Sequence, residues 1–134
     1  MAGTVVNRVT NARTGASLGE RVKAADTWLS RLVGLLGTRA LAPAHGLWLN
    51  PCGGVHTVGM RYPIDVVFLD KESRVRKTAS RVRPYRFCMA RPGVRSALEL
   101  PAGTLDGADV QLGDPLVFEP VSARPVERRR KEQE

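Results

Sequence analysis

Residues 51–70, PCGGVHTVGMRYPIDVVFLD, hold the densest group of side chains that could do chemistry. Cys52, His56, Arg61 and Asp65 all lie within this stretch. A histidine near a carboxylate can act as a general base, and a thiolate can act as a nucleophile or a metal ligand. The sequence therefore predicts a polar site here, without specifying a reaction.

Asp65 stands inside an apolar, strand-like run, IDVVFL. Strand parity places its side chain on the same face as Val67 and Leu69. A buried carboxylate without a partner costs about 1–3 kcal/mol or more, so Asp65 requires a cation or N–H donors. Arg61 is the nearest cation in sequence. Two interpretations stay open: Asp65 accepts backbone N–H bonds from the loop at 60–63, which we favour, or it faces a ligand.

Glu99 alternates with leucines in the sequence LEL and therefore faces away from them. Three hypotheses are open for it. It is a plain exposed residue, it pairs across the sheet with the arginines of residues 81–86, or it joins Asp65 and His56 in one pocket.

The two cysteines and two histidines, Cys52, Cys88, His45 and His56, lack the paired spacing of a structural zinc site. Both cysteines are expected to be reduced thiols, with Cys88 in the core. No metal and no cofactor is predicted. A Cys-x-x-x-His pair is not a recognised catalytic signature, so no residue is assigned a catalytic role.

Residues 71–95 carry nine basic residues and one acid, and their net charge of +8 equals that of the whole chain. The candidate anion-binding residues are Arg74, Arg76, Arg81, Arg83 and Arg86. Arginines that alternate with apolar residues are also typical of a solvated edge strand. Nucleic-acid binding would require stacking aromatics among them. Tyr85 and Phe87 are present, but Phe87 is expected to point inward.

The elements that position these residues are mostly short strands. Period-two patterns and turn residues predict strands at 4–10, 19–25, 47–49, 64–69, 74–79, 81–83, 85–89, 97–100 and 115–119. Apolar residues spaced by three and four predict one main helix at about 26–37. We therefore expect a single α+β domain over residues 1–121, with a β-rich curved sheet or open barrel, and a disordered charged tail at 122–134.

The chain has no apolar run of the length needed to cross a bilayer and no signal-peptide pattern at its N-terminus. We expect a basic cytoplasmic protein that does not bind membranes.

Several sequence blocks occur in a distinctive order: RLVGLLG (31–37), GLWLNPCGGVHTVGM (46–60), PIDVVFLD (63–70), LELPAGT (98–104) and QLGD (111–114). In these blocks the chain resembles the domain of unknown function 192 family of uncharacterised bacterial and archaeal proteins. The resemblance implies a compact β-rich domain with one helix packed on a curved sheet or open barrel, and implies no activity. Many relatives have a Trp-Met-Lys-Asn type segment where this chain has residues 55–57, so a role of that aromatic does not carry over.

The leading hypothesis is a binding or accessory module for a small ligand or a protein partner. Its candidate pocket consists of Cys52, His56, Arg61, Asp65 and Glu99. One alternative is a small hydrolase-like enzyme with Asp65 and His56 as acid and base. The other is a binder of anionic polymers such as nucleic acid, through residues 71–95.

Overall fold

The structure is a computed structural model that describes residues 5–25, 42–52, 54–57, 61–89 and 91–121. Strands hold 57% of the described residues and helical turns only 4%, so the prediction of an α+β fold around one main helix is wrong. The stretches on which the helix (26–37) and the charged tail (122–134) were predicted lie outside the described residues. Within the described ranges, no helix has the length and apolar character needed to cross a membrane.

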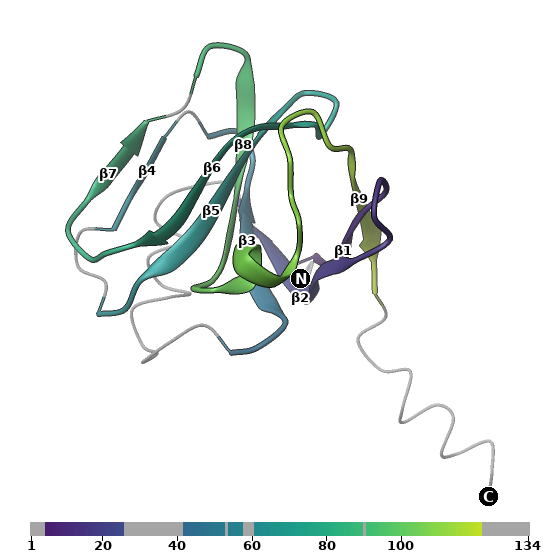
Figure 1. Ribbon diagram of the computed structural model, residues 1–134, viewed down its shortest axis with the longest axis horizontal. Coiled ribbons are helices and arrows are strands. Elements are labelled where there is room, and N and C mark those ends of the chain that lie inside the picture. The colour runs from purple at the N-terminus through teal and green to yellow at the C-terminus, as the bar shows by residue number, and fades with distance from the viewer. Residues whose placement is uncertain (1–4, 26–41, 53, 58–60, 90, 122–134) are drawn as a thin grey trace, which may run out of the picture.

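The described residues form nine strands and one 3-10 turn (Figure 1). They are β1 (Val6–Asn11), β2 (Ser17–Ala25), β3 (His45–Leu49), β4 (Gly54–His56), β5 (Ile64–Asp70), β6 (Val75–Val82), β7 (Phe87–Met89), β8 (Val94–Pro101), η1 (Thr104–Gly107) and β9 (Leu116–Pro120). Seven strands form one sheet in the order β6-β5-β8-β3-β2-β1-β9, in which only β2 and β3 are parallel neighbours. Strands β4 and β7 form a separate antiparallel pair.

The seven-stranded sheet curves but is not a closed barrel, which corrects the expectation of a barrel. Its two edge strands, β6 and β9, meet only where they begin, through an isolated bridge between Arg74 and Pro115. The N–H of Val75 donates to the carbonyl of Asp114 at 2.9 Å beside that bridge. Among the described residues this contact joins 73–75 to 113–116, and most of both edges is not paired with the other.

Apolar residues cover both faces of the sheet, which is why β5 is buried along nearly its whole length. Val67 and Leu69 belong to a first core, on one face, whereas Val66 and Phe68 belong to a second core, on the other. The parity predicted for this strand is therefore confirmed. The second core also contains Val55 of β4, so the β4–β7 pair supplies a layer over this face of the sheet.

Candidate functional site

Asp65 is fully buried, and its carboxylate accepts three backbone hydrogen bonds. Oδ1 accepts from the N–H of Arg81 at 2.7 Å, and Oδ2 accepts from Gly103 at 3.1 Å and Leu105 at 2.8 Å. These donors lie in β6 and beside η1, whereas the sequence suggested donors in the loop at 60–63. The arrangement ties a strand to a turn and stabilises the carboxylate in the core.

A β-bulge in β6 explains why Arg81 has a spare N–H. The register shifts so that Ser80 and Arg81 together lie opposite the single residue Asp65. Such an extra residue is left out of the ladder of backbone hydrogen bonds. Arg81 also has a φ of 49°, in the left-handed region. The Asp65 carboxylate therefore satisfies a donor that the sheet itself cannot.

Glu99 is also fully buried, but on the opposite face of the sheet from Asp65. In register, Glu99 lies beside Leu47 and Val66, which belong to the second core. Asp65 lies beside Leu100, which belongs to the first. The two carboxylates therefore do not share a pocket. Strand β8 lies between β5 and β3, so the arginines of β6 are not cross-strand neighbours of Glu99.

The other predicted pocket residues are spread over different surroundings. Cys52 is half-buried against the second core, and its thiol donates to the carbonyl of Gly54 at 2.9 Å. His56 lies in β4, opposite Phe87 in β7. Arg61 is exposed. Among the residues that the structure describes, no three of the types His, Cys, Asp and Glu are grouped so that they could hold a metal ion.

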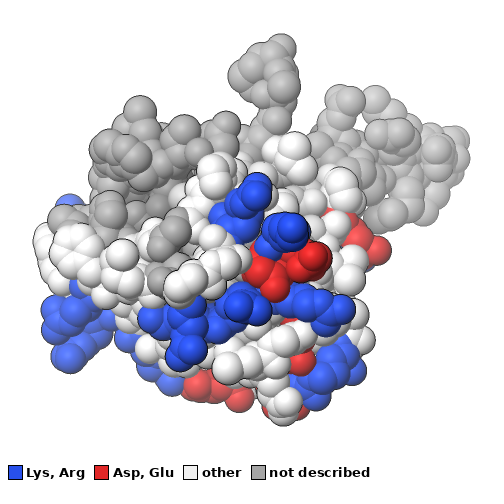
Figure 2. Space-filling view, turned by 90° about the horizontal axis from the view of Figure 1, so that it is seen from above, with Lys and Arg blue, Asp and Glu red and all other residues white. Residues whose placement is uncertain are grey.

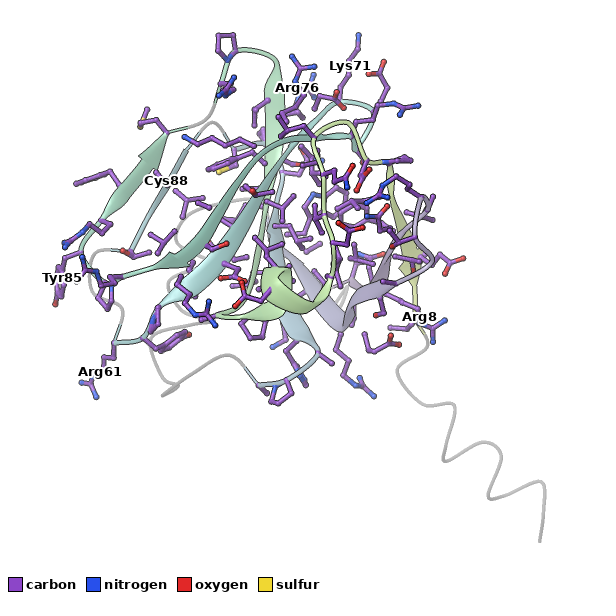
Figure 3. All side chains as sticks on the ribbon, viewed as in Figure 1. Arg8, Arg61, Lys71, Arg76, Tyr85 and Cys88 are labelled. Carbon is purple, nitrogen blue, oxygen red and sulfur yellow. The ribbon has the colours of Figure 1, made fainter. Side chains whose placement is uncertain are left out.

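The predicted anion-binding arginines divide into two groups. Arg74 directly precedes β6 and Arg76 is its second residue. The face of the molecule seen in Figure 2 carries basic and acidic side chains mixed together. Arg76 lies 4.0 Å from the Asp70 carboxylate, and Arg74 donates to the carbonyl of Gly113 at 3.3 Å. Figure 3 places Arg76 and Lys71 together at this end of the molecule.

The remaining arginines lie at the far end of β6 and beyond it. Arg81 forms an exposed ion pair with Asp106 at 2.5 Å. Arg83 and Arg86 are exposed on either side of Tyr85.

Three exposed apolar side chains accompany Arg83 and Arg86. Tyr85 is 64% exposed, Phe87 is 74% exposed and Met89 is 67% exposed, which makes three of the six large exposed apolar side chains among the described residues. We call the group formed by Arg83, Tyr85, Arg86, Phe87 and Met89 the β7 surface. The prediction that Phe87 points inward is wrong. Cys88 takes the inward position of β7 and packs against the second core instead.

Thr57 holds the loop that presents this surface. Its hydroxyl donates to the carbonyl of Arg83 at 2.6 Å and accepts from the N–H of Arg86 at 2.8 Å. Its backbone also bonds to Tyr85 and Arg86, each at 2.9 Å. Tyr85 has a φ of 62°, so the chain turns here before β7 begins. The turn interrupts the alternation of side chains between the two faces. Alternation continued from the preceding strand therefore could not predict which face Phe87 takes.

A third buried carboxylate, that of Asp114, belongs to a separate polar cluster. Its side chain accepts from Nε of Arg13 at 2.6 Å, from Nδ2 of Asn11 at 2.9 Å and from the N–H of Gln111 at 2.8 Å. The hydrogen bond from the Arg13 guanidinium, supported by Asn11 and Gln111, lowers the pKa of Asp114 to about 2 although burial opposes this shift. The cluster joins the end of β1 to the turn before β9 and is structural.

Comparisons with known proteins give a family and a fold. Residues 9–118 match the family model DUF192, described as "Uncharacterized ACR". A UPF0127 protein of Thermococcus sibiricus is 33% identical over 104 residues, which cover 74% of this chain and 66% of that protein, just under two thirds of its length. A UPF0127 protein of Pyrococcus furiosus is 28% identical over 120 residues, which cover 79% of this chain and 93% of that protein.

Two solved structures share the fold. A protein of Sinorhizobium meliloti described as a putative transcription regulator has a TM-score of 0.72 and 25% identity, and the match covers 87% of this chain and 94% of that one. A protein of unknown function from Novosphingobium aromaticivorans has a TM-score of 0.72 and 20% identity, with 84% of each chain covered.

Proposed function

We propose that this chain, which belongs to the DUF192 family of uncharacterised proteins, is a binding module for an anionic polymer. The contact area is the β7 surface. The observation that carries the proposal is the exposure of Tyr85 (64%) and Phe87 (74%) directly beside Arg83 and Arg86. Aromatic rings interleaved with arginines are a combination used to bind nucleic acids.

The charge of the β7 surface supports an anionic partner. Within the described part of the chain, neither Arg83 nor Arg86 forms an ion pair with a carboxylate, whereas Arg81 is paired with Asp106. The charge of a guanidinium without a carboxylate neighbour is not compensated by an adjacent anion, so it attracts a phosphate or sulfate. Nη1 of Arg86 donates to the carbonyl of Tyr85 at 3.4 Å. Both arginines are therefore suited to contact a polymer backbone.

The polar-pocket and hydrolase hypotheses receive less support from the geometry. Asp65 is enclosed in the fold and already accepts three backbone N–H bonds, so it has little capacity left for a ligand. Glu99 lies on the other face of the sheet. An acid and a base that act on one substrate need a common point within hydrogen-bond reach of both.

The relative from Sinorhizobium meliloti is described as a putative transcription regulator. That description concerns the relative. A nucleic-acid ligand for the present chain is compatible with it, and this compatibility adds modest support to an anionic-polymer function.

The test is binding of the full chain to labelled DNA, RNA and heparin, measured by fluorescence anisotropy over a series of salt concentrations. The double variant Arg83→Glu/Arg86→Glu is compared with Arg21→Glu/Lys23→Glu, which changes the net charge equally on exposed positions of β2. We expect wild-type affinity to fall steeply with salt, and the β7-surface variant to reduce the salt slope by about 2 because two phosphate contacts are lost. The β2 variant should keep most of the slope.

Two results would contradict the proposal. If wild-type protein binds none of the polymers at low salt, the chain is not an anionic-polymer binder. If both double variants lose the same affinity, the attraction comes from net charge and the β7 surface is not the contact area.

A further inference from the structure

We infer that the ligand of the β7 surface is single-stranded nucleic acid, with bases stacked on Tyr85 and Phe87 and phosphates contacting Arg83 and Arg86. This inference rests on the proposed function and specifies its ligand. It starts from the order of the residues: in the segment Arg83-Pro84-Tyr85-Arg86-Phe87, cations and rings alternate. A single strand of nucleic acid likewise alternates between phosphates and bases, and the faces of its bases are open for stacking.

The exposed rings of Tyr85 and Phe87 favour a ligand with planar groups that can stack on them. Exposed apolar side chains that are grouped on a soluble protein often mark an interaction site. Tyr85 lies in the turn before β7 and Phe87 is the first residue of β7, so only Arg86 separates the two aromatic residues along the chain. Two rings this close in sequence suit neighbouring bases of a single strand. A duplex keeps its bases stacked inside and offers these rings only its backbone or its ends.

Met89 and Lys77 extend the surface along β7. The Met89 sulfur lies 3.5 Å from the position that a Cβ at Gly54 would occupy, so the thioether lies over the neighbouring strand β4. The ammonium of Lys77 donates to the carbonyl of Met89 at 2.6 Å. The exposed apolar side chains therefore follow one another from Tyr85, in the turn, to Met89, at the end of β7, with Arg83 and Arg86 near one end and Lys77 near the other.

The rigidity of the loop favours stacking over loose attraction. The hydrogen bonds between Thr57 and the 83–86 loop fix the backbone that carries Tyr85 and Arg86. Phe87 is held by the pairing of β7 with β4. A preorganised surface loses less conformational entropy when it binds. Both rings therefore meet a ligand without reordering the chain.

The experiment compares three DNA probes of equal length: oligo(dT), an abasic strand with the same number of phosphates, and a blunt duplex. The variant Tyr85→Ala/Phe87→Ala is set against Leu112→Ala/Val117→Ala, which removes exposed apolar side chains elsewhere. We expect wild-type protein to bind oligo(dT) at least tenfold more tightly than the other probes, because each stacked base contributes separately from the phosphates. The ring variant should lose this preference and keep its salt slope, and the control variant should behave as wild type.

The possible failures are distinguishable. If the abasic strand or the duplex binds as tightly as oligo(dT), the inference about stacking is overturned and the proposed anionic-polymer function stands. If no DNA probe binds, the inference is overturned, and the proposed function also fails if RNA and heparin do not bind at low salt. A ring-dependent affinity for poly-glutamate equal to that for oligo(dT) would assign the surface to an acidic protein and overturn the inference. Unchanged circular dichroism and thermal unfolding of the ring variant verify that it is folded.

Discussion

The backbone N–H of Arg81 donates a 2.7 Å hydrogen bond to the buried carboxylate of Asp65. Through its other oxygen, Asp65 also accepts from Gly103 and Leu105, so one side chain joins the bulge of β6 to the turn at η1. The Arg81 side chain also connects β6 to η1 at the surface, where it forms an ion pair with Asp106. The buried bond and the exposed ion pair connect the same two segments in very different surroundings.

The first prediction concerns Asp65→Asn. An amide offers one oxygen where the carboxylate offers two, and its NH₂ group faces backbone donors, so at least one buried N–H loses its acceptor. We expect the free energy of unfolding to fall by about 2 kcal/mol. Urea denaturation measures this loss.

The matched control is Asp106→Asn, which weakens only the exposed pair with Arg81 and should cost about 1 kcal/mol or less. A loss well under 1 kcal/mol for Asp65→Asn, comparable to the control, would show that the carboxylate does not hold these segments together.

The second prediction concerns acid. The folded-state pKa of Asp114, about 2, lies below its ordinary value of 3.8. Its contribution to the free energy of unfolding, on the order of 2 kcal/mol, is therefore complete above about pH 4 and is lost as the pH falls toward 2. The free energy of unfolding, measured from pH 5 to pH 2, should fall less steeply in Asp114→Asn than in wild type. Asp109→Asn, which changes the exposed partner of Arg13, should retain most of the wild-type slope.

The third prediction concerns the contact between β3 and β8. A Cβ at Gly46 would lie 2.7 Å from the carbonyl oxygen of Glu99, so Gly46→Ala requires one strand to shift. We expect a loss of about 1–3 kcal/mol. Gly107→Ala is the control, because a Cβ there meets nothing within 4 Å. Equal stability of the two variants in thermal unfolding would contradict the close approach of these strands.

The fourth prediction separates surface from core aromatics. Phe87 is 74% exposed whereas Phe68 is fully buried in the second core. We expect Phe87→Ala to change the free energy of unfolding by about 0.5 kcal/mol or less, and Phe68→Ala to lower it by about 3–5 kcal/mol. A large loss in Phe87→Ala, seen by urea denaturation, would mean that this ring packs in the fold and is not available to a ligand.

The sequence predicted β5 well because period-two alternation directly determines which face a strand residue takes. Val67 and Leu69 do lie on one core and Val66 and Phe68 on the other. The same reasoning correctly turned Glu99 away from its flanking leucines. It could not show that Glu99 is buried, because a second layer, β4 with β7, covers that face.

The candidate site was harder to predict than the fold. The donors to Asp65 lie 16 to 40 positions away along the chain, at a bulge and a turn that carry no local signature. The exposed position of Phe87 depends on a left-handed Tyr85 and on hydrogen bonds from Thr57, which reset the alternation before β7. Long-range hydrogen bonds and changes of strand phase of this kind do not appear in composition or spacing.

The most direct test of the account is to map the ligand contact on the protein itself. Backbone amide NMR shifts of the full chain are recorded during titration with oligo(dT). We expect the largest shifts in residues 83–89 and in the neighbouring strand β4, with little change in β1, β2 and β9. Two results would contradict binding at the β7 surface. They are shifts centred on the mixed acidic and basic side chains around Lys71 and Arg76, or a spectrum unchanged by saturating oligo(dT).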